Sequence, residues 1–252
     1  MAHLITLLTD FGTKDSYVAE VKGVILSQVP SATIVDITHD IKPYQIEEAA
    51  FNLLRAYACF PAHAHHLVVV DPGVGTNRKC IFVKTGHGSF IGPDNGVLLW
   101  AIRDAEKFKK KAALAYEIPV VEKAGSTFHG RDVFAPFLVE HLRGKKQRLR
   151  RITTLTGREF PKAAHGVGKI SGEILYEDHF GNTVTNIPVG KAPVRANIGR
   201  YQVHTAPNYE AIPASKVALV RGSHGFWEFA AHQESSSKRL RLKKGDPITL
   251  FS

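Results

Sequence analysis

Three strand-like segments in the first half of the chain each lead into a carboxylate or a polar loop. HLITLLT precedes Asp10, TIVDI precedes Thr38–His39–Asp40, and HHLVVV precedes Asp71. In a parallel sheet the carboxyl ends of neighbouring strands lie side by side, and ligands bind in the crevice above them. We therefore expect Asp10 and Asp71 to share one ligand pocket. The alternative for each is a helix cap or an Asx-turn, the usual place of a lone aspartate in such a loop.

Three further stretches carry polar side chains that suit ligand binding. In TFHGRD (127–132), His129 stands beside a glycine that lets the backbone approach a ligand while the imidazole points into the crevice. DHFGNTVTNI (178–187) and RGSHGFWEFA (221–230) combine amides, hydroxyls and aromatic rings, which suit a purine. The alternative is a helix cap for His129 and a pair of capped β-turns for the other two stretches.

The elements that must position these residues follow a strand-helix-strand order over about the first 155 residues. Apolar, β-branched runs alternate with amphipathic stretches, and the helix expected at 16–29 has Asp15 or Ser16 as its N-cap. Further helices are expected at 46–60, about 96–108 and about 133–142, and further strands at 80–85 and 89–94. This order predicts an α/β domain (1–155) with a mostly parallel sheet flanked by helices.

The pattern changes after about residue 160, where short alternating runs are separated by Gly, Pro and Asn. Such runs predict a smaller antiparallel β-barrel domain, which we place at 166–252. The boundary falls in RITTLTGREFPKAAHG (151–166).

Composition narrows the class of protein. The chain has 252 residues, a formal charge of +10 and two cysteines, Cys59 and Cys80. The basic excess gathers in KFKKK (107–111) and RGKKQRLRR (143–151), which we interpret as solvated helix ends and linker, with a nucleic-acid contact as the alternative. Two separated cysteines, no secretory leader pattern and no long apolar run predict a soluble cytoplasmic protein.

Six motifs together resemble one family along almost the whole chain. They are TDFG, VDPGVG with an arginine three residues later, PDNG, TFHGRD, DxFGN and GSHxxxE, and they occur in the family's order. The family is the S-adenosyl-L-methionine hydroxide adenosyltransferases, which are related to the fluorinating and chlorinating enzymes. The resemblance implies hydrolysis of S-adenosyl-L-methionine to adenosine and L-methionine, with S-adenosyl-L-methionine as substrate and with no metal and no separate cofactor.

The resemblance also implies a catalytic triad made of Asp71, Arg78 and His129. The tight Pro-Gly turn after Asp71 would place its carboxylate and the Arg78 guanidinium on either side of one water molecule. Arg78 would stabilise hydroxide character, while Asp71 or His129 would accept the proton. The sequence does not decide between these two acceptors. A halide nucleophile would be repelled by the carboxylate, so hydroxide is expected.

By the same resemblance, Asp10 binds the ribose hydroxyls, and Asn182 and Ser223 hold the ribose or methionine ends. Asp178 and Glu228 lie near the methionine amino group, Tyr209 covers adenine, and the main chain up to Gln233 reads the adenine edge. The local match is looser at Tyr44 and Asp94. The segment after Glu228, Ala230–Ser236, departs from the AVNxGSA pattern common in relatives, which affects the shape of the pocket more than the chemistry.

The family is typically trimeric, with each site between the first domain of one subunit and the second domain of its neighbour, so a homotrimer is expected. Two alternatives stay open at this point. One is a sensor that binds S-adenosyl-L-methionine or adenosine without turnover. The other is a metal-dependent hydrolase, for which HAHH (63–66) is the most tempting ligand set, although it precedes a strand at the end away from the crevice.

Overall fold

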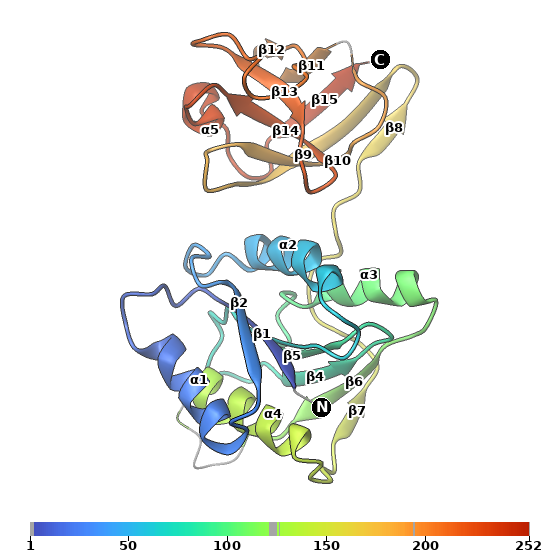
Figure 1. Ribbon diagram of the computed structural model, residues 1–252. Coiled ribbons are helices and arrows are strands. Elements are labelled where there is room, and N and C mark those ends of the chain that lie inside the picture. The colour runs from blue at the N-terminus through green and yellow to red at the C-terminus, as the bar shows by residue number, and fades with distance from the viewer. Residues whose placement is uncertain (1–2, 121–124, 126, 194, 252) are drawn as a thin grey trace. The chain divides into compact units, whose positions relative to one another are not determined.

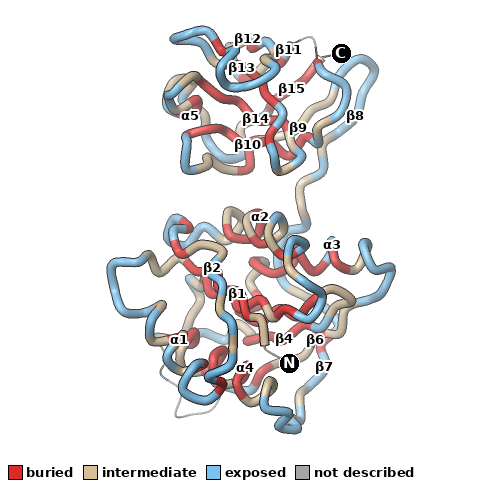
Figure 2. Tube along the Cα trace, viewed as in Figure 1, coloured by how far each residue is buried: buried red, intermediate tan, exposed pale blue. Residues whose placement is uncertain are grey.

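The computed structural model describes residues 3–120, 125, 127–193 and 195–251. The chain divides into two compact units, Met1–Glu159 and Phe160–Ser252 (Figure 1). In the first unit the buried positions lie in the strands and on the helices that cover them, and in the second unit they lie mostly in the strands (Figure 2). Within the described ranges, no helix has the length and apolar character needed to cross a membrane.

The first unit is a seven-stranded sheet in the order β2-β1-β3-β5-β4-β6-β7, with helices on both faces. Its elements are β1 (Leu4–Thr9), α1 (Tyr17–Gln28), β2 (Thr33–Thr38), α2 (Ile46–Ala56), the 3-10 helix η1 (Tyr57–Cys59), β3 (His65–Val69), β4 (Cys80–Lys84), β5 (Ser89–Pro93), α3 (Leu99–Lys109), β6 (Leu114–Ile118), the π-helix η2 (Gly130–Phe134), α4 (Ala135–Leu142) and β7 (Arg150–Ile152). Neighbours β2, β1, β3 and β5 are parallel. Strand β4 runs against β5 and β6, and β7 runs against β6, so β6 points the same way as the four parallel strands.

Two apolar layers hold this sheet between its helices. On one face, Val21 and Ile25 of α1 and Leu138 of α4 pack against strand residues such as Leu67. On the other face, residues of α2 and α3 pack against the opposite side of the same strands. Because both faces are covered, the inner strands β3, β4 and β5 are buried along almost their whole length, as in a layered α/β domain. The predicted α/β fold with a mostly parallel sheet is confirmed.

The second unit is an antiparallel, nearly closed barrel in the order β12-β11-β15-β9-β10-β14-β13, with β8 beside β9. Its elements are β8 (Ala164–Gly166), β9 (Lys169–Glu177), β10 (Thr183–Pro188), β11 (Arg195–Ile198), β12 (Tyr201–Val203), β13 (Val217–Arg221), β14 (Phe226–Ala231), α5 (Ser236–Leu240) and β15 (Pro247–Phe251). A bridge between Thr205 and Leu219 brings the two ends of the sheet together. Trp227, Phe229 and Leu250 belong to its apolar core, and the predicted barrel is confirmed.

Local structure differs from the sequence prediction in three places. Strands β6 and β7 were not expected, and β7 begins inside the basic stretch that we interpreted as linker, where Arg150 pairs with Glu117. Short, charged edge strands of this kind carry little apolar pattern. At the start of α1, Ser16 occupies the N-cap, but its hydroxyl donates to Glu20 and does not cap the backbone. The helix expected at 133–142 is α-helical only from Ala135, and its start belongs to the π-helix η2, next to Pro136, which lacks the N–H that an α-helical turn would use.

Two histidines at the start of β3, the partly buried His65 and the buried His66, are expected to make the stability of the fold depend on acid. His65 Nδ1 lies 2.7 Å from Ser89 Oγ, and His66 Nδ1 lies 2.8 Å from Thr6 Oγ1. Burial, and then the neighbouring histidines, lower the pKa of His65 to about 4 and that of His66 to about 3. The unfolded chain therefore binds more protons than the folded chain below about pH 6.5, and stability is lost as the pH falls from there toward 3.

The wild-type protein should lose free energy of unfolding as the pH falls from 6.5 to 4. We expect the replacement His66→Phe to make this loss smaller by on the order of 3 kcal/mol. The ring keeps its packing beside Phe90. The measurement is the free energy of unfolding by urea at a series of pH values, with the exposed His63→Phe as the matched control. An unchanged slope for His66→Phe would show that this buried imidazole does not titrate with folding.

Candidate active site

The carboxyl ends of β1 and β3 lie side by side, with Thr9 in register with Val69. Asp10 and Asp71, which follow these strand ends, both line a cavity of about 300 Å³. His129 reaches the same cavity from the segment before η2. The other described residues that line it are Phe11, Tyr17, Pro43, Tyr44, Val69, Val74, Thr127, Phe128 and Gly130.

A tight turn between β3 and β4 brings Arg78 back onto Asp71. The Val74 N–H donates to the Asp71 carbonyl at 3.2 Å, and Gly75 takes a positive φ of 76° that favours glycine. A side chain at residue 73 would meet Arg78 Cγ at 3.3 Å, so Gly73 leaves room for the arginine to fold over the turn. The glycines therefore allow the two charged groups to meet.

Asp71, Arg78 and His129 form one hydrogen-bonded cluster. Arg78 donates to both carboxylate oxygens of Asp71, from Nε to Oδ1 at 2.9 Å and from Nη2 to Oδ2. The same Nη2 lies 2.7 Å from His129 Nδ1. The side chains of Arg78 and Asp71 are only 9% and 5% exposed, so water screens this ion pair weakly.

This geometry corrects one expectation. We expected a water molecule between the Asp71 carboxylate and the Arg78 guanidinium, but the two groups contact each other directly in a two-pronged pair. A planar guanidinium matches a carboxylate edge to edge, which leaves no room between them. A water molecule that reacts here must lie to one side of the pair, toward the cavity.

The contacts of His129 define its protonation. Burial, and then the charge of Arg78, lower the pKa of His129, so its neutral form is favoured. A guanidinium carries only donors, and therefore Nδ1 of His129 must accept the hydrogen bond from Arg78. The one proton of the neutral ring is thus assigned to Nε2, which makes that edge of the ring a donor.

Asp10 sits in a different environment. Its Oδ2 accepts a hydrogen bond from the Tyr44 N–H at 3.0 Å. Burial raises the pKa of Asp10, the Tyr44 N–H opposes that shift, and the charge of Asp71 adds to it. Asp10 is therefore close enough to Asp71 for the two charges to interact.

Aromatic rings wall the same cavity and were missed in the sequence. The rings of Phe11, Tyr17 and Phe128 lie 5.3–5.9 Å apart in a mutually tilted cluster. Two of them stand inside the motifs TDFG and TFHG, which was the available signal. Such a wall suits the flat or apolar part of a ligand.

The two weaker candidates differ from each other. Tyr44 lines the cavity, has a positive φ of 68° and is 71% exposed. Asp94 is buried, and both of its oxygens accept hydrogen bonds from Thr156, at 2.8 Å and 3.0 Å. Asp94 therefore fastens the segment around Thr156 and does not line the cavity.

Polar residues of the second unit form two local groups. Asp178 Oδ1 accepts from the backbone N–H of Asn182 at 2.8 Å, and Oδ2 accepts from its side-chain amide at 3.0 Å. Glu228 is buried and contacts Tyr209 Oη at 2.6 Å and His224 Nε2 at 2.7 Å. Burial, and then Glu228 and Asp178, raise the pKa of Tyr209, so the two groups are near each other.

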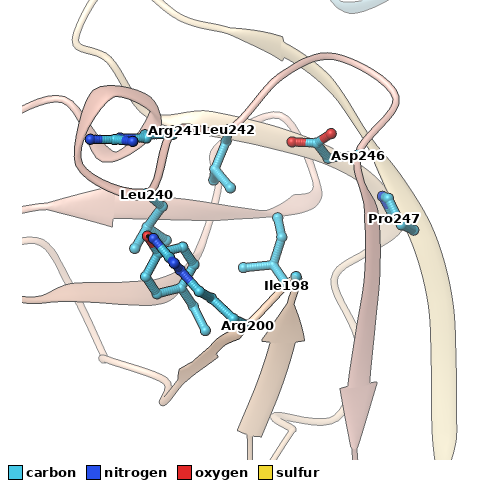
Figure 3. Close-up of a pocket in the computed structure, with 9 residues that line it drawn as sticks. Ile198, Arg200, Leu240, Arg241, Leu242, Asp246 and Pro247 are labelled. Carbon is cyan, nitrogen blue, oxygen red and sulfur yellow. The ribbon is translucent and has the colours of Figure 1, made fainter.

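Two other predicted residues of this unit lie in exposed turns. Ser223 is exposed in the turn between β13 and β14, and Gln233 is exposed with a positive φ of 53°. A cavity of about 290 Å³ in this unit, lined among others by Ile198, Arg200 and Asp246, contains none of the predicted site residues (Figure 3).

The histidines of HAHH do not assemble a metal site with the aspartates. His65 and His66 begin β3, whereas Asp71 follows its other end. Among the residues that the structure describes, no group of three or more His, Cys, Asp or Glu side chains is arranged to hold a metal ion.

Comparison with known proteins gives a consistent result. Residues 5–151 match the model of the SAM hydroxide adenosyltransferase N-terminal domain, and residues 172–249 match that of its C-terminal domain. The chain is 37% identical to an (R)-S-adenosyl-L-methionine hydrolase of Methanocaldococcus jannaschii, covering 98% of this chain and 95% of that protein. It is 33% identical to the hydrolase of the same name from Thermus thermophilus, covering 98% and 99%.

More distant and structural relatives agree with this match. A fluorinase of Nocardia brasiliensis is 26% identical over 52% of this chain and 51% of its own length. An uncharacterized conserved protein of Thermotoga maritima superposes with a TM-score of 0.83 at 34% identity, covering 98% of this chain and all of that one.

Proposed function

The chain belongs to the SAM hydroxide adenosyltransferase family, and we propose that it is an enzyme that hydrolyses S-adenosyl-L-methionine to adenosine and L-methionine. Relatives that carry the name (R)-S-adenosyl-L-methionine hydrolase support this over nearly the full length. The observation that carries the proposal is the convergence of Asp71, Arg78 and His129 at a cavity that Asp10 also lines.

The reaction is a direct displacement at C5′ of the ribose. The oxygen of water forms a bond to C5′ while the bond from C5′ to the sulfonium sulfur breaks, and the electron pair of that bond stays on sulfur. Methionine leaves as a neutral thioether, so the departure needs no acid. Water is the weak partner, and the enzyme must hold it in line with the breaking bond and remove its proton.

The contacts of the cluster favour Asp71 as the proton acceptor. Neutral His129 uses Nδ1 to accept from Arg78, so its Nε2–H can donate to the water but cannot take a proton. Each oxygen of Asp71 accepts one bond from Arg78 and keeps a second lone pair for the water. Arg78 holds the carboxylate in place, and its charge stabilises the developing hydroxide.

Asp10 is proposed to bind the substrate's ribose. A carboxylate accepts hydrogen bonds from both hydroxyls of a 2′,3′-diol, and the Tyr44 N–H donates to Oδ2 of Asp10 and so helps to fix its orientation. The rings of Phe11, Tyr17 and Phe128 would cover apolar parts of the substrate. The sulfonium is already activated for displacement, so this mechanism uses no metal or separate cofactor.

The polar groups of the second unit are proposed to bind the rest of the substrate. Asn182, Ser223 and Asp178 would contact the ribose and methionine ends, and Tyr209 and the backbone up to Gln233 would contact adenine. Glu228 is buried with both oxygens engaged, so we assign it the task of orienting Tyr209 and His224.

We also propose a cytoplasmic homotrimer in which these groups act on the first unit of a neighbouring subunit. Two free cysteines, one exposed and one buried, fit a reducing compartment. Mixing inactive Asp71→Asn subunits with inactive Asn182→Ala subunits should then restore part of the activity. Some mixed trimers then contain a site with an intact Asp71 from one subunit and an intact Asn182 from its neighbour. Activity is measured after co-refolding, with each variant alone as control. No rescue would place the whole site within one chain.

The proposed function is tested by incubating the purified protein with S-adenosyl-L-methionine and quantifying the products by liquid chromatography and mass spectrometry. Adenosine and methionine are expected in equal amounts. Tight binding of S-adenosyl-L-methionine without either product would instead identify a sensor.

A further inference from the structure

A buried thiol completes the surroundings of the Arg78 guanidinium. Arg78 Nη1 donates to Cys80 Sγ at 2.8 Å, and the same sulfur lies 3.8 Å from His129 Nδ1. Cys80 is 1% exposed. Arg78 ends the turn two residues before β4 begins at Cys80, and its side chain reaches the sulfur there.

The sheet holds this sulfur in place. Cys80 is the first residue of β4, where it pairs with Pro93 of β5 and with Ile118 of β6. Its backbone is therefore fixed by neighbours on both sides. Arg78, by contrast, comes from the turn, and its side chain must be held by its contacts.

We propose that Cys80 is a positioning residue that fixes the plane of the Arg78 guanidinium, so that Arg78 donates hydrogen bonds to Asp71 and His129 at the same time. This inference rests on the proposed function of the site. Asp71 engages Nε and Nη2, and His129 engages Nη2, which leaves Nη1 to the sulfur. A buried N–H without an acceptor is costly, so the guanidinium would turn to find one if the sulfur were removed.

A neutral acceptor suits this place better than a charged one. Burial raises the pKa of the Cys80 thiol, against the opposing effect of Arg78, so the group stays uncharged. A second carboxylate here would compete with Asp71 for the guanidinium. The thiol orients Arg78 without changing the charge of the Asp71 and Arg78 pair.

The test compares three replacements. Cys80→Ala removes the acceptor, Cys80→Val fills the space without an acceptor, and Cys80→Ser restores an acceptor. We expect Ala and Val each to lower kcat about tenfold with KM changed less than about twofold, and Ser to recover most of the loss. Cys59→Ala, which alters the exposed cysteine, is the matched control.

A pH titration separates positioning from a merely structural role. Because Arg78 helps to lower the pKa of His129, a loosened Arg78 should raise that pKa and move the acid limb of the kcat profile to higher pH in Ala and Val. The imidazole signal of His129 in NMR, assigned by its loss in His129→Gln, should shift its titration in the same direction without substrate.

The inference is overturned if Cys80→Ala keeps the wild-type kcat and the wild-type titration of His129, or if Val restores activity as well as Ser. The NMR titration needs no turnover, so it tests the positioning role by itself. Failure of the wild-type protein to release adenosine would instead count against the proposed function.

Discussion

Replacing Asp71 by asparagine should lower kcat by about 10³-fold, with KM changed only a few-fold. The amide has nearly the same shape but cannot take the proton of the water. It also turns an NH2 group toward the donors of Arg78, which now lacks its two-pronged partner. The measurement is steady-state kinetics of adenosine release, after circular dichroism has shown that the variant is folded.

Two further variants show whether this loss is specific to Asp71. Asp40→Asn, an exposed aspartate after β2, should keep wild-type kinetics. His129→Gln should lose only about tenfold, because glutamine can replace the Nε2–H donor. A larger loss for His129→Gln than for Asp71→Asn would make His129 the proton acceptor and would contradict the assignment.

The second large effect is expected at Asp10. Asp10→Asn should lower kcat/KM by about 10²-fold or more, since two hydrogen bonds from ribose hydroxyls to a charged acceptor are weakened. The Tyr44 N–H, which donates to Asp10, would keep the loop in place. The loss should appear mainly in KM.

A substrate analogue sharpens this prediction. The wild-type enzyme should discriminate strongly against 2′-deoxy S-adenosyl-L-methionine, and Asp10→Asn should discriminate much less. Equal discrimination by both proteins would show that Asp10 does not contact that hydroxyl, because a double-mutant cycle isolates the pairwise interaction.

The fold of the first unit was predictable because its buried strands and amphipathic helices leave strong periodic patterns. The sequences of strands β6 and β7 carry weaker periodic patterns. Strand β7 is a three-residue edge strand containing Arg150 and Arg151, and its pairing with β6 depends on partners distant in sequence. The π-helix η2 was also missed, because it arises from a missing hydrogen-bond donor at Pro136 and not from a repeat of apolar residues.

The meeting of Asp10 and Asp71 at one cavity followed from their places after parallel strands. The contacts between the side chains could not be predicted from the sequence. The direct pairing of Asp71 with Arg78 depends on how far the arginine folds over Gly73, and the contact with Cys80 depends on the register of β4. For Glu228, the sequence showed a polar residue among aromatics. It did not show that both carboxylate oxygens are already hydrogen-bonded, one to Tyr209 and one to His224.

The central claim is that solvent oxygen attacks C5′ of S-adenosyl-L-methionine. The most direct measurement is one incubation in ¹⁸O-water, followed by mass spectrometry of the products. We predict adenosine with one ¹⁸O in its 5′-hydroxyl and unlabelled methionine. Unlabelled adenosine, or 5′-methylthioadenosine with ¹⁸O-labelled homoserine, would contradict the account, because the water would then have attacked elsewhere.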